Sequence, residues 1–339
     1  MLVISVAVIG AGYWGPNLIR NFATCADTKL VAVCEKDPKR LAKVLAPYPA
    51  VEGVTDLDTL LKRSDIDAVA IATPVRTHAP FAIAALEAGK HVLVEKPFAH
   101  SVADAERMVA LADKLGLTLM VDHTFVYSPA VRKVKELLDK GELGDLCYID
   151  SVRINLGMFQ HDVNVVWDLA PHDLSIVDFL LGRLPKSLSA VGACHTKGSI
   201  ELEDVAHLNL DFGDGLLASF HVNWLSPVKV RHFIVGGLKK SIVYNDLDVS
   251  ERVRVYDRGI TTSEDPEARR GILINYRTGD VWSPHIDQHE PLQTMVKHFA
   301  ECVRDKKKSL TDGESGLRVV RVLEAAERSI KAQGGRITL

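Results

Sequence analysis

The most constraining feature of this 339-residue chain is a glycine-spaced turn near its start. Gly10, Gly12 and Gly15 form the pattern G-x-G-x-x-G. The pattern follows the apolar run 5–10, and Pro16 marks the start of a helical segment behind it. Such glycines permit a tight turn and close approach to a pyrophosphate, and the helix N-terminus offers unpaired N–H groups to its charge. We therefore predict a dinucleotide-binding turn, in preference to a structural glycine turn.

The first 122 residues repeat the same alternation of strand and helix. One helical segment lies at 78–88 and is closed by Gly89, and Ser101 is a candidate cap for another that ends at Gly116. Short apolar runs, typical of strands buried on both faces, lie at 5–10, 29–34, 68–72, 91–94 and 117–121. We predict an N-terminal Rossmann domain, a doubly wound parallel sheet, over residues 1–122.

A different pattern begins near Tyr127. Consecutive strand-like runs between 188 and 256 are expected to pair antiparallel, with turns at 213–215, 226–227 and 236–237. Helices are expected at 129–140, 171–181, 292–305 and 316–332, and the polar segment 258–284 is interpreted as a long loop. Residues 123–339 are therefore predicted to form an α+β domain with a large, mostly antiparallel sheet and helices on one face.

Composition argues against several classes of function. The 41 Lys and Arg residues are scattered among 44 Asp and Glu residues, which gives a net charge of −3 and no basic field for a nucleic acid. No apolar stretch reaches the roughly 20 residues that cross a bilayer, and no cleavable signal pattern is present, so we expect a cytoplasmic protein without a membrane partner. The five cysteines lack Cys-x-x-Cys spacing, and His285 and His289 lack an obvious third ligand, so no metal site is expected.

An acidic residue on the second predicted strand indicates which dinucleotide is bound. Glu35 lies 20 residues past Gly15, where its carboxylate can accept hydrogen bonds from an adenosine ribose. A carboxylate there would repel a 2′-phosphate, which favours NAD over NADP. Lys36, Lys39 and Arg40 are close enough in the sequence to offset that repulsion, so NADP stays possible.

Further candidate contacts follow the third predicted strand. Thr73 and Pro74 end this strand and His78 opens the next helix, on the edge that should face the nicotinamide. For His78 the alternative is an exposed ring at a helix start. The predicted cofactor-binding residues are Gly10, Gly12, Tyr13, Trp14, Gly15, Glu35, Lys36, Arg40, Thr73, Pro74, His78, Glu95 and Lys96.

Lys96 is the candidate catalytic cation. It lies in Glu95-Lys96-Pro97, directly after the apolar run 91–94. A strand that ends in a lysine directs an ammonium group to the carboxyl edge of the sheet, where open α/β sheets bind ligands. The alternative is a solvated lysine at a strand end.

Four motifs together resemble the Gfo/Idh/MocA family of nicotinamide-dependent sugar and polyol oxidoreductases. They are VIGAGYWG, ATPVRTH, VLVEKP and WDLAPHD, and the resemblance covers nearly the whole chain. It implies a Rossmann domain, a C-terminal α/β domain whose large sheet commonly supports oligomerisation, and an active site between them. It also implies a cis peptide bond before Pro97 and a catalytic set of Lys96, Asp168 and His172.

These residue types suit the oxidation of a secondary alcohol. Imidazole is a suitable base near neutral pH, so His172 is the candidate acceptor of the hydroxyl proton. Lys96 would hold the hydroxyl and stabilise the developing alkoxide, although a neutral lysine could act as the base instead. Asp168 would orient the imidazole or bind a substrate hydroxyl. A structural histidine and a helix N-cap are the alternatives for His172 and Asp168.

A finer resemblance indicates the substrate. GYWGPNLIRNF, DVNVVWDLAPHD and NWLSPVKVR resemble enzymes that oxidise the C3 hydroxyl of UDP-N-acetylglucosamine or its uronic acid, which yields a 3-keto sugar nucleotide for an aminotransferase. Arg153, Lys229 and Arg231 are candidates to bind the diphosphate, unless they pair with acids on neighbouring strands. His123 and Tyr127 are candidates to line the sugar pocket, with core packing as the alternative.

Three other functions stay open. They are a free sugar or myo-inositol dehydrogenase, a reductase of 3-keto nucleotide sugars, and a non-catalytic NAD-binding regulator. The presence of Lys96, Asp168 and His172 together argues against the regulator. We expect a nucleotide-sugar substrate and a homodimer or homotetramer formed through the C-terminal sheet.

Overall fold

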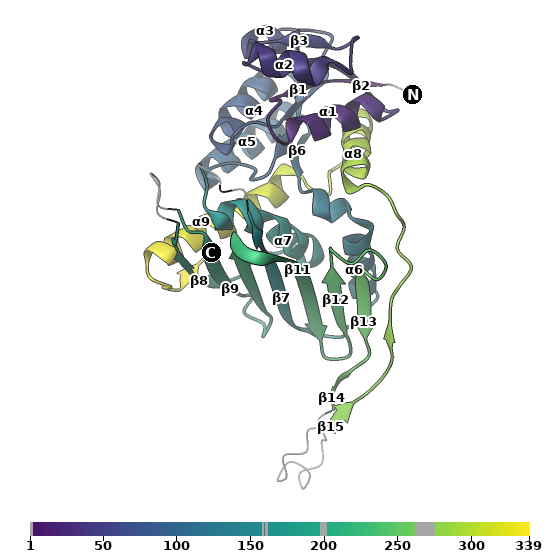
Figure 1. Ribbon diagram of the computed structural model, residues 1–339, viewed down its shortest axis with the longest axis vertical. Coiled ribbons are helices and arrows are strands. Elements are labelled where there is room, and N and C mark those ends of the chain that lie inside the picture. Colours follow the sequence, from purple (N-terminus) through teal and green to yellow (C-terminus); the bar gives the residue numbers. More distant parts are fainter. Residues whose placement is uncertain (1–2, 158, 160–161, 197–201, 262–274) are drawn as a thin grey trace. The chain divides into compact units, whose positions relative to one another are not determined.

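The structure is a computed structural model that describes residues 3–157, 159, 162–196, 202–261 and 275–339 (Figure 1). The chain divides into two compact units, which are described separately. The first unit comprises residues 1–128, 174–179 and 289–324, and the second comprises 129–173, 180–288 and 325–339. The division at residues 122/123 into a cofactor domain and a substrate domain stays a prediction about function.

A six-stranded parallel sheet forms the centre of the first unit. Its strand order is β3-β2-β1-β4-β5-β6, in which the chain winds outward from β1 and then from β4. This is the doubly wound order, so the predicted Rossmann sheet is confirmed. The strands are β1 (Ile4–Ile9), β2 (Thr28–Cys34), β3 (Glu52–Val54), β4 (Ala68–Ile71), β5 (His91–Glu95) and β6 (Leu119–Asp122).

Helices connect these strands and begin and end where capping chemistry predicts. Ser101 accepts a hydrogen bond from the N–H of Asp104 at the start of one helix, and Gly116 ends it with a φ of 63°. Gly89, with a φ of 76°, follows another. The helices are α1 (Gly15–Thr24), α2 (Pro38–Leu45), α3 (Leu57–Leu61), α4 (His78–Glu87) and α5 (Val102–Leu115).

A late helix completes the core of the first unit. α8 (Pro291–Asp305) packs against α1, and the rings of Phe22 and Phe299 meet edge to face with centroids 6.2 Å apart. Both phenylalanines are fully buried. The boundary predicted at residue 122 placed α8 in the C-terminal domain, outside this unit. The contact between α1 and α8 joins segments almost 280 residues apart, and no local sequence pattern predicts such a contact.

A nine-stranded sheet forms the centre of the second unit. Its order is β16-β13-β12-β11-β7-β10-β9-β8-β17, and every pair is antiparallel except β7 with β10. The predicted, mostly antiparallel sheet is therefore confirmed. Its strands are β7 (Leu146–Leu156), β8 (Ser187–Ala193), β9 (Val205–Asp211), β10 (Leu217–Asn223), β11 (Leu225–Gly237), β12 (Ser241–Asn245), β13 (Val253–Tyr256), β16 (Val281–Trp282) and β17 (Ile337–Thr338).

Burial alternates along the strands of this second sheet. In β9 and β10 every second residue is buried, while the residues between them are partly or fully exposed. One face therefore packs on the unit's core and the other stays open. The helices α6 (Pro129–Asp139), α7 (Val165–Leu181) and α9 (Gly313–Lys331) lie within residues assigned wholly or partly to this unit, and α6 packs against β12.

Four local predictions were wrong. The turn expected at 236–237 lies in the last two residues of β11, and the chain bends at 238–239 instead. The turn expected at 226–227 lies inside β11, where the register shifts between Leu225 and Val230, an irregularity that accommodates a proline without an N–H group. The loop expected at 258–284 contains the paired strands β14 (Gly259–Thr261) and β15 (Asn275–Arg277) as well as β16, while its residues 262–274 lie outside the described part. The helix expected from Pro171 begins at Val165.

Candidate active site

The glycine turn joins β1 to α1 and leaves no room for side chains at two positions. Gly10 has a φ of 98°, and a Cβ atom there would lie 2.4 Å from the carbonyl oxygen of Ala72 at the end of β4. A Cβ atom on Gly15 would lie 2.3 Å from the carbonyl oxygen of Gly10. A Cβ atom on Gly12 would meet nothing within 4 Å, so this part of the turn is open to a ligand.

The N-terminus of α1 has no side-chain cap and could bind an anion. Trp14 occupies the N-cap position without a side-chain hydrogen bond to the first turn, and a proline lies among the first helical residues. The first N–H groups of α1 therefore lack a capping side chain, as a site for a pyrophosphate requires. Together with the open Gly12, this arrangement fits the dinucleotide expected from the sequence.

Glu35 connects the glycine turn to the second strand. Its buried carboxylate accepts hydrogen bonds from the N–H of Ala11 at 2.9 Å and from the N–H of Asp37 at 3.1 Å. The half-exposed guanidinium of Arg40 lies 3.4 Å from the same carboxylate. A carboxylate offers about four acceptor positions, so capacity remains for a ribose hydroxyl. Lys36 is exposed beside it.

His78 holds the ends of two neighbouring strands together. Its Nδ1 lies 2.8 Å from the carbonyl oxygen of Pro97 after β5, and its Nε2 lies 2.7 Å from that of Thr73 after β4. The ring is 1% exposed, so the alternative of an exposed ring at a helix start was wrong. Pro74 and Tyr13 are exposed near the same edge of the sheet. Their contacts with a cofactor stay predictions.

Lys96 directly follows the last residue of β5, at the carboxyl edge of the sheet. The peptide bond between Lys96 and Pro97 is cis, as the resemblance implies. The Lys96 side chain is partly buried, and its backbone N–H donates to Glu95 Oε2 at 3.2 Å. A charge on a partly buried side chain acts more strongly on its neighbours than one in water.

The two candidates for the sugar pocket in the first unit are both buried. Burial and the charge of Lys96 lower the pKa of His123 to about 3, so its imidazole is neutral. The hydroxyl group of Tyr127 lies 3.0 Å from Thr311 Oγ1, and burial raises its pKa. Tyr127 therefore occupies the core, the alternative that the sequence left open.

In the second unit, α7 carries Asp168 and His172. The two residues are four positions apart and partly exposed, so they lie on the same face of the helix. Asn164 caps the helix by accepting the N–H of Trp167 at 3.1 Å, which corrects the alternative that Asp168 is the N-cap. Asp168 instead accepts a hydrogen bond from the indole Nε1 of Trp224 at 3.1 Å. Trp224 was missed from the sequence, although it lies in the NWLSPVKVR motif.

The three cations expected to bind a diphosphate differ in exposure. Arg153 is 3% exposed and donates two hydrogen bonds to Asp173, at 2.8 and 2.7 Å. Arg231 donates to Asp246 at 2.7 Å. Both are paired with acids, the alternative left open for them, whereas Lys229 on β11 is exposed. Lys229 is thus the most accessible of the three candidates.

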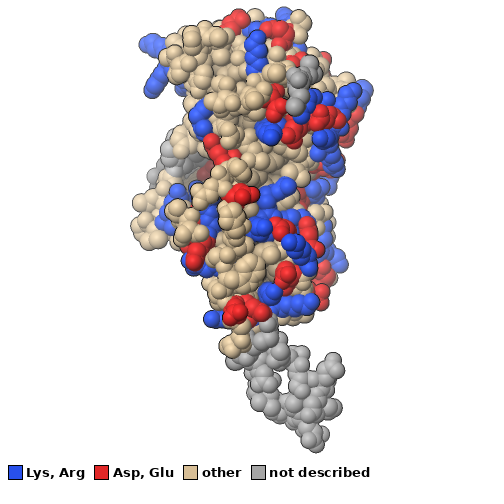
Figure 2. All heavy atoms as spheres, turned by 90° about the vertical axis from the view of Figure 1, so that its right-hand side faces the viewer, with Lys and Arg blue, Asp and Glu red and all other residues tan. Residues whose placement is uncertain are grey.

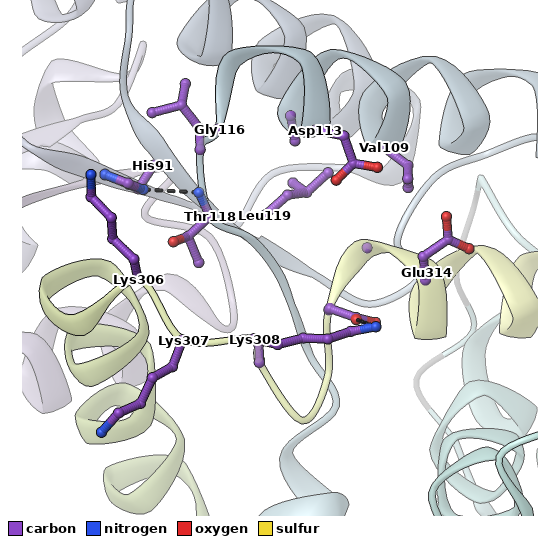
Figure 3. Close-up of a pocket in the computed structure, with 15 residues that line it drawn as sticks. His91, Val109, Asp113, Gly116, Thr118, Leu119, Lys306, Lys307, Lys308 and Glu314 are labelled. Carbon is purple, nitrogen blue, oxygen red and sulfur yellow. Dashed lines mark hydrogen bonds and ion pairs between the residues drawn. The ribbon is translucent and has the colours of Figure 1, made fainter.

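A cavity of about 430 Å³ lies at the opposite edge of the first unit's sheet (Figure 3). His91 and Leu119, which begin β5 and β6, line it, and His91 accepts a hydrogen bond from the N–H of Thr118 at 2.9 Å. Lys307 and Lys308 on its rim pair with acids at 3.0 and 3.1 Å. Because open α/β sheets bind ligands at the carboxyl ends of their strands, we assign this cavity no part in the candidate active site.

Two further observations concern the surface and the helices. On the face that Figure 2 shows, basic and acidic side chains are interspersed, so this face presents no basic field. Among the described residues, no helix combines the length and the apolar character needed to span a bilayer.

Comparisons with known proteins cover most of the chain. A model described as an oxidoreductase family with an NAD-binding Rossmann fold matches residues 4–123, and one described as the GFO/IDH/MocA C-terminal domain matches residues 131–243. A curated relative, dTDP-3,4-didehydro-2,6-dideoxy-alpha-D-glucose 3-reductase of Streptomyces violaceoruber, is 28% identical over 92% of this chain and 91% of its own.

Two solved structures superpose over nearly the whole chain. A provisionally assigned oxidoreductase from Magnetospirillum magnetotacticum is 30% identical over 96% of this chain and 99% of its own, with a TM-score of 0.82. A UDP-N-acetylglucosamine 3-dehydrogenase from Acidithiobacillus ferrooxidans is 23% identical over 98% of this chain and 99% of its own, with a TM-score of 0.81. At that identity, the second likeness shows the fold alone.

Proposed function

The chain belongs to the Gfo/Idh/MocA oxidoreductase family, and from this premise we propose that it uses NAD to oxidise the C3 hydroxyl of a UDP-linked N-acetylhexosamine. The substrate is UDP-N-acetylglucosamine or its uronic acid, and the product is a 3-keto sugar nucleotide for an aminotransferase. The observation that carries the proposal is that one sheet presents an open glycine turn, an uncapped α1 N-terminus and Lys96 at its carboxyl edge.

The cofactor would be held by the turn and by Glu35. The first N–H groups of α1 would bind its pyrophosphate, and Glu35 would accept a ribose hydroxyl. When bound, NAD supplies the acceptor for the hydride that leaves the sugar carbon. Glu35 favours NAD, because a 2′-phosphate would lie beside a buried carboxylate, although the exposed Arg40 offers a partly compensating charge.

The chain's own residues would manage the proton and the developing charge. His172 would accept the hydroxyl proton, and Asp168, held by Trp224, would orient the imidazole or bind a neighbouring hydroxyl. Lys96 would hold the hydroxyl and stabilise the alkoxide that forms. The exchanged assignment, with a neutral Lys96 as the base, is distinguished by variants described in the Discussion.

The substrate class is supported by the sequence motifs and by one relative. DVNVVWDLAPHD and NWLSPVKVR carry the resemblance to nucleotide-sugar enzymes. The relative from Streptomyces violaceoruber is named as a 3-reductase of a dTDP-linked keto sugar, which is redox chemistry at the same sugar carbon. Its name also favours one second candidate, the reverse reaction, because the residues that remove a proton can return it.

A substrate panel tests the proposal. We expect reduced cofactor to appear with UDP-N-acetylglucosamine or its uronic acid, faster with NAD than with NADP. We expect kcat/KM for the nucleotide sugar to exceed that for the free sugar by at least about 10²-fold, because the free sugar loses the binding energy of the diphosphate. Absorbance and product mass are followed, with an aminotransferase present to remove the keto product. Turnover of myo-inositol or glucose, with none of any UDP-hexosamine, contradicts the proposal.

We also propose that the open face of the nine-stranded sheet joins two copies of the chain. Leu217 and Tyr148 are partners in register on this face and are 56% and 41% exposed. Four residues further along β10, the rings of His221 and its register partner His207 stack with centroids 4.2 Å apart. Such exposed apolar area is typical of an interface. Light scattering is expected to give a dimer or tetramer and Leu217→Glu to shift it toward monomer; a monomeric wild type contradicts this.

A further inference from the structure

Two buried carboxyl groups lie side by side beneath the candidate active site. Glu95 ends β5 and Asp122 ends β6, and the two are partners in register. Glu95 is 8% exposed and Asp122 is 2% exposed. Two ionised carboxylates at this depth would repel each other with little solvent to screen them.

Asp122 accepts more hydrogen bonds than Glu95. Asp122 accepts a hydrogen bond from the indole Nε1 of Trp14 at 3.3 Å and another from the hydroxyl of Thr124. Glu95 Oε2 accepts the backbone N–H of Lys96, whereas Oε1 is buried without an N–H or O–H donor among the described residues. Donors stabilise a carboxylate, so the surroundings of Asp122 suit a negative charge better than those of Glu95.

As neighbours in register, Glu95 and Asp122 lie where their carboxyl groups can form a hydrogen bond. Since carboxylates only accept, a bond between two carboxyl groups needs a proton on one of them. Burial, followed by the charge of Asp122, raises the pKa of Glu95 well above its ordinary value. Protonation of Glu95 gives the donor that joins it to Asp122.

Lys96 is the cation that acts on the pair among the described residues. His123 is neutral, since its pKa is about 3, and burial raises the pKa of Tyr127, so its hydroxyl is neutral as well. The charge of Lys96 acts on Glu95. A protonated Glu95, an ionised Asp122 and a cationic Lys96 sum to zero charge, which a buried site favours.

We propose that Glu95 and Asp122 form an acid pair that shares one proton, held on Glu95, and that its single negative charge positions the Lys96 ammonium group. The pair is a positioning device, and this part of the inference rests on the role proposed for Lys96. Through Trp14, the N-cap of α1, the pair also joins the cofactor turn to the strand that carries Lys96.

Infrared spectroscopy of the whole protein without substrate or cofactor tests the shared proton. At neutral pH the wild type is expected to show the carbonyl stretch of a protonated carboxyl group, and Glu95→Gln to lose it. Glu136→Gln is the matched control: Lys133 and Lys140 lower the pKa of the exposed Glu136 to about 2, so its loss leaves that signal and the activity in place. A wild type without the signal, or a Glu95→Gln variant that keeps it, overturns the proposal.

The pH dependence of kcat/KM tests the positioning charge. Adding Asp122→Asn to Glu95→Gln removes the last negative charge and favours loss of the Lys96 proton. The decline of kcat/KM on the alkaline side is expected to begin at a lower pH than in Glu95→Gln alone, because a cation loses its proton more easily without a neighbouring negative charge. If the alkaline decline of kcat/KM begins at the same pH in both variants, and thermal unfolding shows that the double variant is folded, the positioning role is overturned. The infrared experiment does not depend on enzymatic activity, so it tests the shared proton even if the proposed function is wrong.

Discussion

Replacing Lys96 by methionine is expected to lower kcat by about 10²- to 10⁴-fold, the loss typical of a missing proton-transfer group or of a missing donor to a developing alkoxide. The physical reason is that Lys96 directly follows β5 at the carboxyl edge of the sheet, in a partly buried position. Methionine keeps much of the length of the side chain and removes its charge. Steady-state kinetics with the best substrate of the panel measures the loss, and NAD binding is expected to weaken much less.

A second substitution of Lys96 distinguishes its two possible roles, and a substitution elsewhere is the control. Lys96→Arg keeps a cation that does not deprotonate, so partial activity indicates electrostatic stabilisation, whereas a loss as large as in Lys96→Met indicates that lysine is the base. Lys114→Met, at an exposed position in the last turn of α5, is the control and should leave kcat unchanged. Near-normal turnover of Lys96→Met would remove Lys96 from the active site.

Replacing Asp173 by asparagine is expected to lower the free energy of unfolding by about 3–5 kcal/mol, because it leaves a buried guanidinium without its carboxylate. Arg153 and Asp173 are each 3% exposed and are joined by two hydrogen bonds, at 2.8 and 2.7 Å. The pair holds α7 on β7 next to His172, so kcat should fall as well. Urea denaturation followed by circular dichroism measures the change.

Two controls distinguish the cost of an unpaired buried charge from the cost of losing any charged residue. Arg153→Met combined with Asp173→Leu removes both charges and should cost much less than Asp173→Asn alone, because no unpaired charge is left inside. Asp214→Asn breaks the half-exposed pair of Asp214 with Arg183 and should have a far smaller effect, since water screens that pair. If Asp173→Asn and Asp214→Asn unfold equally easily, the buried pair does not stabilise the unit.

The acid pair shows how much of a site can be predicted from local sequence patterns. Glu95 was named from the sequence because it precedes Lys96, and Asp122 was not, although it follows an apolar run in the same way. Parallel strands bring their carboxyl ends to one edge, so an acid after each of two such runs is a usable signal. Which two strands are neighbours, and in which register, depends on pairing between distant segments.

Exposure was the other property that the sequence left open. Arg153 and Lys229 were equal candidates for the diphosphate, yet one is buried against Asp173 and the other is exposed. The alternation of residues along a strand predicts two faces and does not say which face the core covers. For the same reason, Tyr127 could not be assigned to the core rather than to a pocket.

The sequence by itself determined the Rossmann half of the fold, the glycine turn, most of the helix ends and the position of Lys96 after β5. These depend on local chemistry: glycine tolerates a positive φ, Ser101 caps a helix, and an apolar run makes a buried strand. Only the tertiary structure decided that α8 completes the first unit, that Glu95 meets Asp122 and that Arg153 is buried. Burial and register arise from contacts between residues far apart in the chain, and their free energy exists only once those segments have packed together.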